Sequence, residues 1–104
     1  FAFFQCPSLI SITLPEGLTS IGGDTFSWCY SLNDITLPKG LTSIGGGAFS
    51  GCYSLASITL PESLTSIGSY AFTGCSENAV FTVVRDSWAE KWCKENGKKF
   101  TYGD

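Results

Sequence analysis

The chain has 104 residues, of which 43% are hydrophobic and 14% are charged, and its formal net charge is −3. This length corresponds to one domain, and the absence of a basic stripe argues against a nucleic acid as partner. The sequence contains no His, so the Ser-His and Cys-His arrangements of nucleophilic catalysis are excluded. It has no apolar run long enough to span a membrane, and its first residues do not form a secretory signal.

A 23-residue repeat organises the sequence. Its most regular copy begins at Cys29 and reads CYSLNDITLP, and further copies begin at Cys6 and Cys52. Cys75 begins a degenerate fourth copy, again 23 residues after the last. A fixed period in this range is typical of a solenoid, in which each repeat forms one turn of a continuous stack.

Within one repeat the apolar residues predict two inward-facing walls. Residues 32–37 alternate towards a Pro and predict a short strand with Leu32, Ile35 and Leu37 inside. The segment LTSIG that follows predicts a second inward pair, Leu41 and Ile44, on the opposite wall. A Gly-rich turn then leads to an aromatic residue that we expect to fill the interior, at Phe26, Phe49 and Phe72.

The repeat cysteines occupy one equivalent position in successive turns. Adjacent turns bring such residues to about 4.7–4.9 Å, but parallel Cβ vectors are a poor geometry for a disulfide. We therefore predict buried free thiols. One Cys per turn forms a line rather than a tetrahedron, which argues against a zinc site. A bridge between Cys75 and Cys93 stays open as an alternative.

The C-terminal segment breaks the repeat. It begins with a last strand over residues 80–84, and a helix is expected over about 87–96, with Ser87 and Glu90 as a capping box. Helical spacing places Trp88, Ala89, Trp92 and Cys93 on the face that covers the last turn, and the pairs Glu90–Lys94 and Lys91–Glu95 on the other face. Residues 98–102 predict a final short strand or extended segment.

These patterns divide the chain into repeats over residues 1–84, the first one truncated, and a cap over 85–104. The repeats carry few charges, whereas five acids and five bases lie beyond Cys75. The chain has no initiator Met and starts within a repeat, so we expect a fragment of a longer protein. Its first turn lacks a neighbour, and we expect self-association there through Phe1, Phe3, Phe4, Leu9, Ile12 and Leu14.

The unit L-x-x-I-x-L-P-x-x-L-x-x-I-G-x-x-A-F-x-x-C resembles the BspA-like leucine-rich repeats of bacterial cell-surface proteins. The resemblance implies an α/β repeat fold: a short horseshoe of about four turns, mostly strand and loop, with one capping helix near the C-terminus. It further implies a secreted or surface-displayed module for adhesion or protein recognition. No binding motif of the family transfers to individual residues of this chain.

Two groups of residues are candidates for binding. Outward strand positions form a Thr column and a mixed column beside it, and by the resemblance this sheet is the default binding surface, although Thr also simply suits a solvent-facing strand. Exposed rings in the loop before the strands could hold a sugar or a protein, or could merely shield the core. The candidates are Thr13, Thr36, Thr59 and Thr82; Ser11, Asp34, Ser57 and Val80; and Trp28, Tyr30 and Tyr53.

The leading expectation is a non-enzymatic extracellular module that binds a protein in adhesion. The alternatives are a structural spacer that presents another domain, and a carbohydrate-binding module that uses the aromatic residues. Glu16, Asp24, Asp34 and Glu62 are isolated from one another in sequence, so no catalytic carboxylate pair is evident. We expect no cofactor, no metal and no insertion into a membrane.

Overall fold

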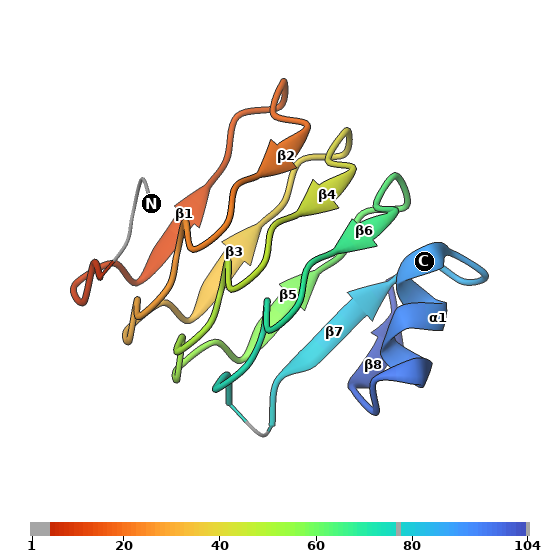
Figure 1. Cartoon of the computed structure of the whole chain (residues 1–104). Coiled ribbons are helices and arrows are strands. Elements are labelled where there is room, and N and C mark those ends of the chain that lie inside the picture. The colour runs from red at the N-terminus through yellow and green to blue at the C-terminus, as the bar shows by residue number, and fades with distance from the viewer. Residues whose placement is uncertain (1–4, 77, 104) are drawn as a thin grey trace.

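The repeats stack into a solenoid with two sheets, each built from parallel strands (Figure 1). The structure is a computed structural model and describes residues 5–76 and 78–103. The larger sheet has the order β1-β3-β5-β7-β8, with strands Ser11–Thr13, Asp34–Thr36, Ser57–Thr59, Val80–Val83 and Lys99–Tyr102. The smaller sheet has the order β2-β4-β6, with strands Ser20–Ile21, Ser43–Ile44 and Ser66–Ile67.

The strands pair at the predicted 23-residue offset. Ile12 faces Ile35, which faces Ile58, so equivalent residues of successive turns lie side by side. The same offset holds in the smaller sheet, where Ile21 faces Ile44. The structure therefore confirms a leucine-rich-repeat solenoid of about four turns with one helix near the C-terminus.

The core runs continuously between the two sheets. Leu32, Ile35 and Leu37 are buried on one wall, and Leu41 and Ile44 on the other, as the repeat predicts. Between the walls, the Phe49 ring stacks on Phe26 at 5.3 Å and on Phe72 at 5.2 Å, centroid to centroid. The burial of each turn thus depends on its neighbours, because the rings of the turns on either side cover both faces of the Phe49 ring.

Close contact between the turns explains the repeated Ile-Gly pair. A Cβ atom added to Gly45 would lie 2.5 Å from the backbone nitrogen of Gly23 in the preceding turn. No side chain fits in that space, so only glycine allows successive turns to approach at this corner.

The four repeat cysteines are free thiols, as predicted, and Cys93 is free as well, so the alternative of a bridge from Cys75 to Cys93 is not realised. Cys29, Cys52 and Cys93 are buried, whereas Cys6 and Cys75 are only half-buried, so the prediction of uniform burial was wrong at the two end turns. In the part of the chain that the structure describes, a further repeat cysteine lies on only one side of Cys6 and of Cys75. The Cys52 thiol donates a 3.1 Å hydrogen bond to the carbonyl of Phe26.

Helix α1, Trp88–Glu95, packs against β7 and β8 at the end of the stack (Figure 1). Ser87 is its N-cap, and Gly97 follows with a φ of +65°, the left-handed geometry expected after a helix. The Trp92 ring lies 5.8 Å from Phe72 and 5.7 Å from Phe81, so it covers the aromatic stack of the last complete turn.

The predicted faces of this helix were partly wrong. Trp88 is exposed instead of covering the last turn, whereas Glu90 is buried with 5% of its surface exposed. The buried face is centred on Ala89, Glu90 and Cys93, because the Glu90 carboxylate bonds to Tyr102 of β8. The predicted pair of Glu90 with Lys94 does form, at 2.9 Å. Phe1, Phe3 and Phe4 lie outside the described residues.

Candidate functional site

The polar columns lie on the outer face of the larger sheet. Thr13, Thr36 and Thr59 are exposed and Thr82 is half-buried. In the second column Ser11, Asp34 and Ser57 are exposed and Val80 is half-buried. Strand pairing aligns each column across β1, β3, β5 and β7, so the candidate residues of different repeats form one surface.

Strand β8 extends both columns by one residue each. It pairs with β7 so that Thr101 lies beside Thr82 and Lys99 lies beside Val80. Sequence reasoning missed these two residues because a helix separates β8 from β7 in the chain. A signal was present, since the segment KFTY repeats the Phe and Thr positions of VFTV at residues 80–83. The second column therefore ends in the cation of Lys99 on β8 and carries the carboxylate of Asp34 on β3.

The three candidate aromatic residues gather into one cluster. Tyr30 and Tyr53 stack at 5.4 Å with an angle of 7° between their planes, as their equivalent positions predict. Trp28 meets both edge-on, at 6.2 Å from Tyr30 and 6.1 Å from Tyr53. The exposed fractions are 36% for Trp28, 43% for Tyr30 and 54% for Tyr53, so the cluster is open to solvent.

The backbone of Trp28 is left-handed, with a φ of +64°. The equivalent residues of the next two turns are Gly51 and Gly74, which have φ values of +77° and +81°. A left-handed backbone costs an ordinary L-residue roughly 1–2 kcal/mol, a cost that glycine avoids. The equivalent residue of the first turn, Gln5, is also left-handed, with a φ of +55°. The second turn thus carries a bulky ring at a left-handed position that the two following turns fill with glycine.

Gly51 also provides the space that the Trp28 ring occupies. A Cβ atom at Gly51 would collide with the six-membered ring of the indole. Gly51, Tyr30 and Tyr53 together hold the ring in one orientation, so the cluster is formed before any ligand arrives.

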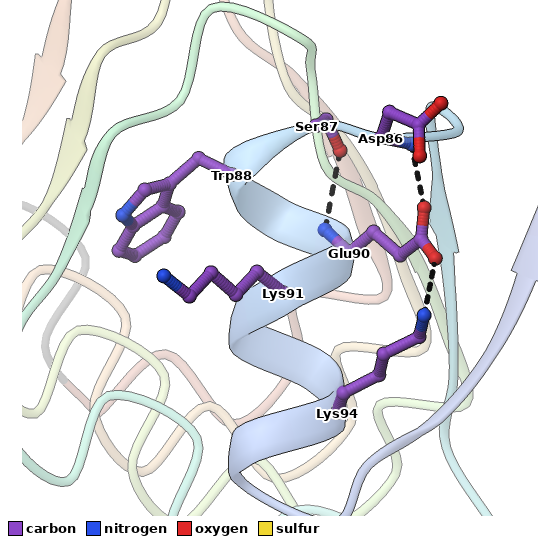
Figure 2. Close-up of a pocket in the computed structure, with 6 residues that line it drawn as sticks. All are labelled: Asp86, Ser87, Trp88, Glu90, Lys91 and Lys94. Carbon is purple, nitrogen blue, oxygen red and sulfur yellow. Dashed lines mark hydrogen bonds and ion pairs between the residues drawn. The ribbon is translucent and has the colours of Figure 1, made fainter.

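A hollow of about 330 Å³ lies at the N-terminal end of α1 (Figure 2). Its polar groups bond to one another. Ser87 Oγ accepts a 3.1 Å bond from the Glu90 amide, and Glu90 Oε1 accepts a 2.6 Å bond from the Asp86 amide. The carboxylate thus caps Asp86 rather than Ser87, which modifies the expected capping box. Trp88 and Lys91 project to the other side of the helix in Figure 2.

The core thiol of Cys52 is not activated as a nucleophile. Burial raises the pKa of the Cys52 thiol to about 12, and the neighbouring Cys75 thiol adds to the effect. Such a thiol is protonated at neutral pH and is a poor nucleophile. Among residues 5–76 and 78–103, no group of three or more acidic or Cys side chains is placed to hold a metal ion. Over the same part of the chain, no helix is long and apolar enough to cross a bilayer.

The sequence profile of the BspA type leucine rich repeat region matches residues 1–87 of the chain, with six copies. The chain belongs to this family. Leucine-rich repeats of this kind generally act as protein-interaction modules and non-enzymatic scaffolds, and family members are typically associated with bacterial surfaces.

Two solved bacterial structures share the fold. A leucine-rich repeat protein from Bacteroides ovatus is 37% identical, with a TM-score of 0.69 over 79% of this chain. The T. pallidum leucine-rich repeat protein is 34% identical, with a TM-score of 0.68 over 78% of this chain. The match spans 23% of the first of these proteins and 49% of the second. The comparison with curated proteins found no match.

Proposed function

We propose that this BspA-type repeat array is a non-enzymatic module that binds a protein at a cell surface, in adhesion, through the outer face of its larger sheet. The observation that carries this proposal is the strand register, which aligns the polar residues of five strands in two columns on one surface. Small Thr and Ser side chains leave the sheet accessible to a partner. Asp34 and Lys99 add opposite charges that would orient that partner.

The proposed surface also suggests a role for each of the two parts of the chain. We propose that residues 1–84 form the recognition surface and that residues 85–104 close its end. The close packing of Trp92 on Phe72 and Phe81 supports this role for the cap. The cap also adds Lys99 and Thr101 to the proposed surface.

Site-specific photo-crosslinking to a panel of extracellular-matrix proteins tests the proposal. A photoreactive residue at Thr36 or Thr59 should give adducts with a panel member. The same residue at Ser66, which is exposed on the smaller sheet, should give none and serves as the control. Thr59→Arg should also weaken binding of the crosslinked protein. Equal labelling from Ser66 would contradict the proposal, and silence at every position would favour the structural spacer.

A further inference from the structure

We propose that Trp28, Tyr30 and Tyr53 form a second binding site, a platform for the apolar face of a neutral pyranose sugar. This cluster is separate from the polar columns, because its residues lie in the loops before the strands and not on the strands. The three aromatic residues are also not part of the pattern that all repeats share. The Trp28 position is Gly in the next two turns, and the Tyr53 position becomes Ser76 one turn later.

The first argument is the conformational cost at Trp28. The Trp28 ring stands at a left-handed position that the two following turns fill with Gly51 and Gly74. Such strain persists only where the surrounding structure enforces it, and ligand sites are one place where it is found. Tyr70 is a second ring with a left-handed backbone, so the strain supports a site at Trp28 only together with the ring contacts to Tyr30 and Tyr53. Gly51 supplies both the matching backbone and the space for the indole.

The second argument is preorganisation. The parallel Tyr rings and the edge-on Trp ring restrain one another, at centroid distances of 5.4–6.2 Å. A ligand would not have to order these side chains on binding, which removes a main cost of association. Each ring also combines an apolar body with a polar tip, so the cluster can contact C–H groups and hydroxyl groups of one ligand.

The third argument is size and charge. Aromatic side chains bury about 150–250 Å² each, so rings that are one-third to one-half exposed offer roughly 200–300 Å² together. A protein partner needs about 800 Å² on each side of a stable interface. The platform therefore suits one to three sugar rings rather than a protein. None of the three side chains is charged at neutral pH, which favours a neutral glycan.

Titration of the isotopically labelled protein with cellohexaose, mannohexaose and maltohexaose tests this inference by NMR. At least one of them, at up to about 10 mM, should shift the indole N–H signal of Trp28, since millimolar binding is detectable there. The indole signals of Trp88 and Trp92 serve as internal references. The amide spectrum of each variant shows whether the fold is retained.

Two variants use residues that the repeat itself supplies. In both variants binding is read from the backbone amide signals of Cys29 and Tyr30, because Trp28→Gly has no indole signal at this position. Trp28→Gly and Tyr53→Ser should each weaken binding about tenfold or more, as expected for central aromatic contacts. Tyr70→Gly is the matched control, because Tyr70 is exposed, has a φ of +61° and occupies the position of Gly47 in the preceding turn. This control should bind as tightly as the unchanged protein.

The outcomes separate this site from the sheet face. If no sugar in the panel moves the Trp28 signal, or if Trp28→Gly binds as tightly as the parent, the inference is wrong. A partner protein that depends on Trp28 while no sugar binds would also overturn it, and would assign the cluster to a protein interface. Failure of the crosslinking experiment at Thr36 and Thr59 would leave the sugar result unaffected.

Discussion

Tyr102 donates its hydroxyl to the carboxylate of Glu90 in a 2.8 Å hydrogen bond, and this bond joins the last strand to the cap helix. The same carboxylate accepts from the Asp86 amide and pairs with Lys94. Arg85 lies 3.9 Å above the Tyr102 ring, which adds a cation–π contact at the same corner. A single buried acid therefore connects the entry to the helix, its second turn and β8.

The first prediction concerns the pH dependence of this junction. The bond from Lys94, followed by those from Asp86 and Tyr102, lowers the pKa of Glu90 to about 2 from its usual 4.5. In acid the unfolded chain therefore takes up a proton at Glu90 before the folded chain does. The stability that Glu90 contributes is complete above pH 4.5 and is lost as the pH falls towards 2.

Thermal unfolding of the unchanged chain and of Glu90→Gln at a series of pH values measures this effect. The gap between the two melting temperatures should be largest at neutral pH and should narrow below pH 4.5. Glu95→Gln, on the exposed side of the helix, is the control and should show a small gap that acid changes little. A gap for Glu90→Gln that stayed constant down to pH 2 would contradict the assigned role.

The second prediction concerns the aromatic stack. Phe49 is fully buried between Phe26 and Phe72, so Phe49→Ala should lower the free energy of unfolding by about 3–5 kcal/mol. Domains of this size have only about 5–15 kcal/mol of stability in total. Thr59→Ala, on the exposed face, should cost well under half as much. Chemical denaturation compares the two, and equal losses would show that the inward and outward positions are misassigned.

The third prediction concerns Trp28 and Gly51 as a pair. Trp28→Gly removes the buried part of the ring, whose burial contributes about 2 kcal/mol, and relieves about 1–2 kcal/mol of backbone cost. The net loss in the free energy of unfolding should therefore stay below about 1 kcal/mol. Gly51→Ala should cost more, because its backbone is left-handed and the added methyl group meets the indole.

A double-mutant cycle by chemical denaturation separates these two causes. In the Trp28→Gly background the collision disappears, so Gly51→Ala should become less harmful by about 0.5 kcal/mol or more. Strictly additive effects would mean that the indole does not constrain Gly51.

The fourth prediction concerns thiol reactivity. Cys52 is buried and its thiol donates a hydrogen bond to the Phe26 carbonyl, and burial raises the pKa of this thiol to about 12. Cys6 is only half-buried. Iodoacetamide at pH 8 should therefore modify Cys6 in the native protein and leave Cys52 intact. Unfolding in denaturant should expose all five thiols, which peptide mass spectrometry can verify. A disulfide between repeats, or equally fast labelling of Cys52, would argue against the buried column.

The fifth prediction concerns β1, an edge strand of the larger sheet. Leu9 and Ile12 are half-buried, whereas their equivalents Leu32 and Ile35 are buried, and Ile10 is 64% exposed. Among residues 5–76 and 78–103, no strand pairs with the outer edge of β1. An open edge beside apolar surface favours association, so the 104-residue chain should form dimers at high concentration. Light scattering should detect them.

A polar capping repeat joined before the first turn should make this chain monomeric. Ile10→Lys should weaken association without loss of fold, because that side chain is already largely exposed. A monomer at high concentration for the uncapped chain, or a dimer that survives the added cap, would show that the edge is not the contact.

The repeat by itself determined most of the solenoid. A 23-residue offset leaves one register in which every Leu, Ile and Phe meets its equivalent, so the inward positions of Leu32, Ile35 and Phe49 follow from spacing alone. The stacking of Tyr30 on Tyr53 follows from the same rule. Local signals at Ser87 and Gly97 were also sufficient to bound the helix, because capping depends on neighbours in the chain.

Only the tertiary structure decided the features that depend on residues distant in the sequence. Strand β8 joins the larger sheet only because helix α1 returns the chain beside β7, and this placed Lys99 and Thr101 on the candidate face. Glu90 is buried and Trp88 exposed because the orientation of the helix is set by its contacts with Tyr102, Phe72 and Phe81. The left-handed backbone of Trp28 likewise comes from the stack, because Gln5, Gly51 and Gly74 are left-handed at the equivalent positions and the Trp28 amide bonds to the carbonyl of Ser50 in the next turn.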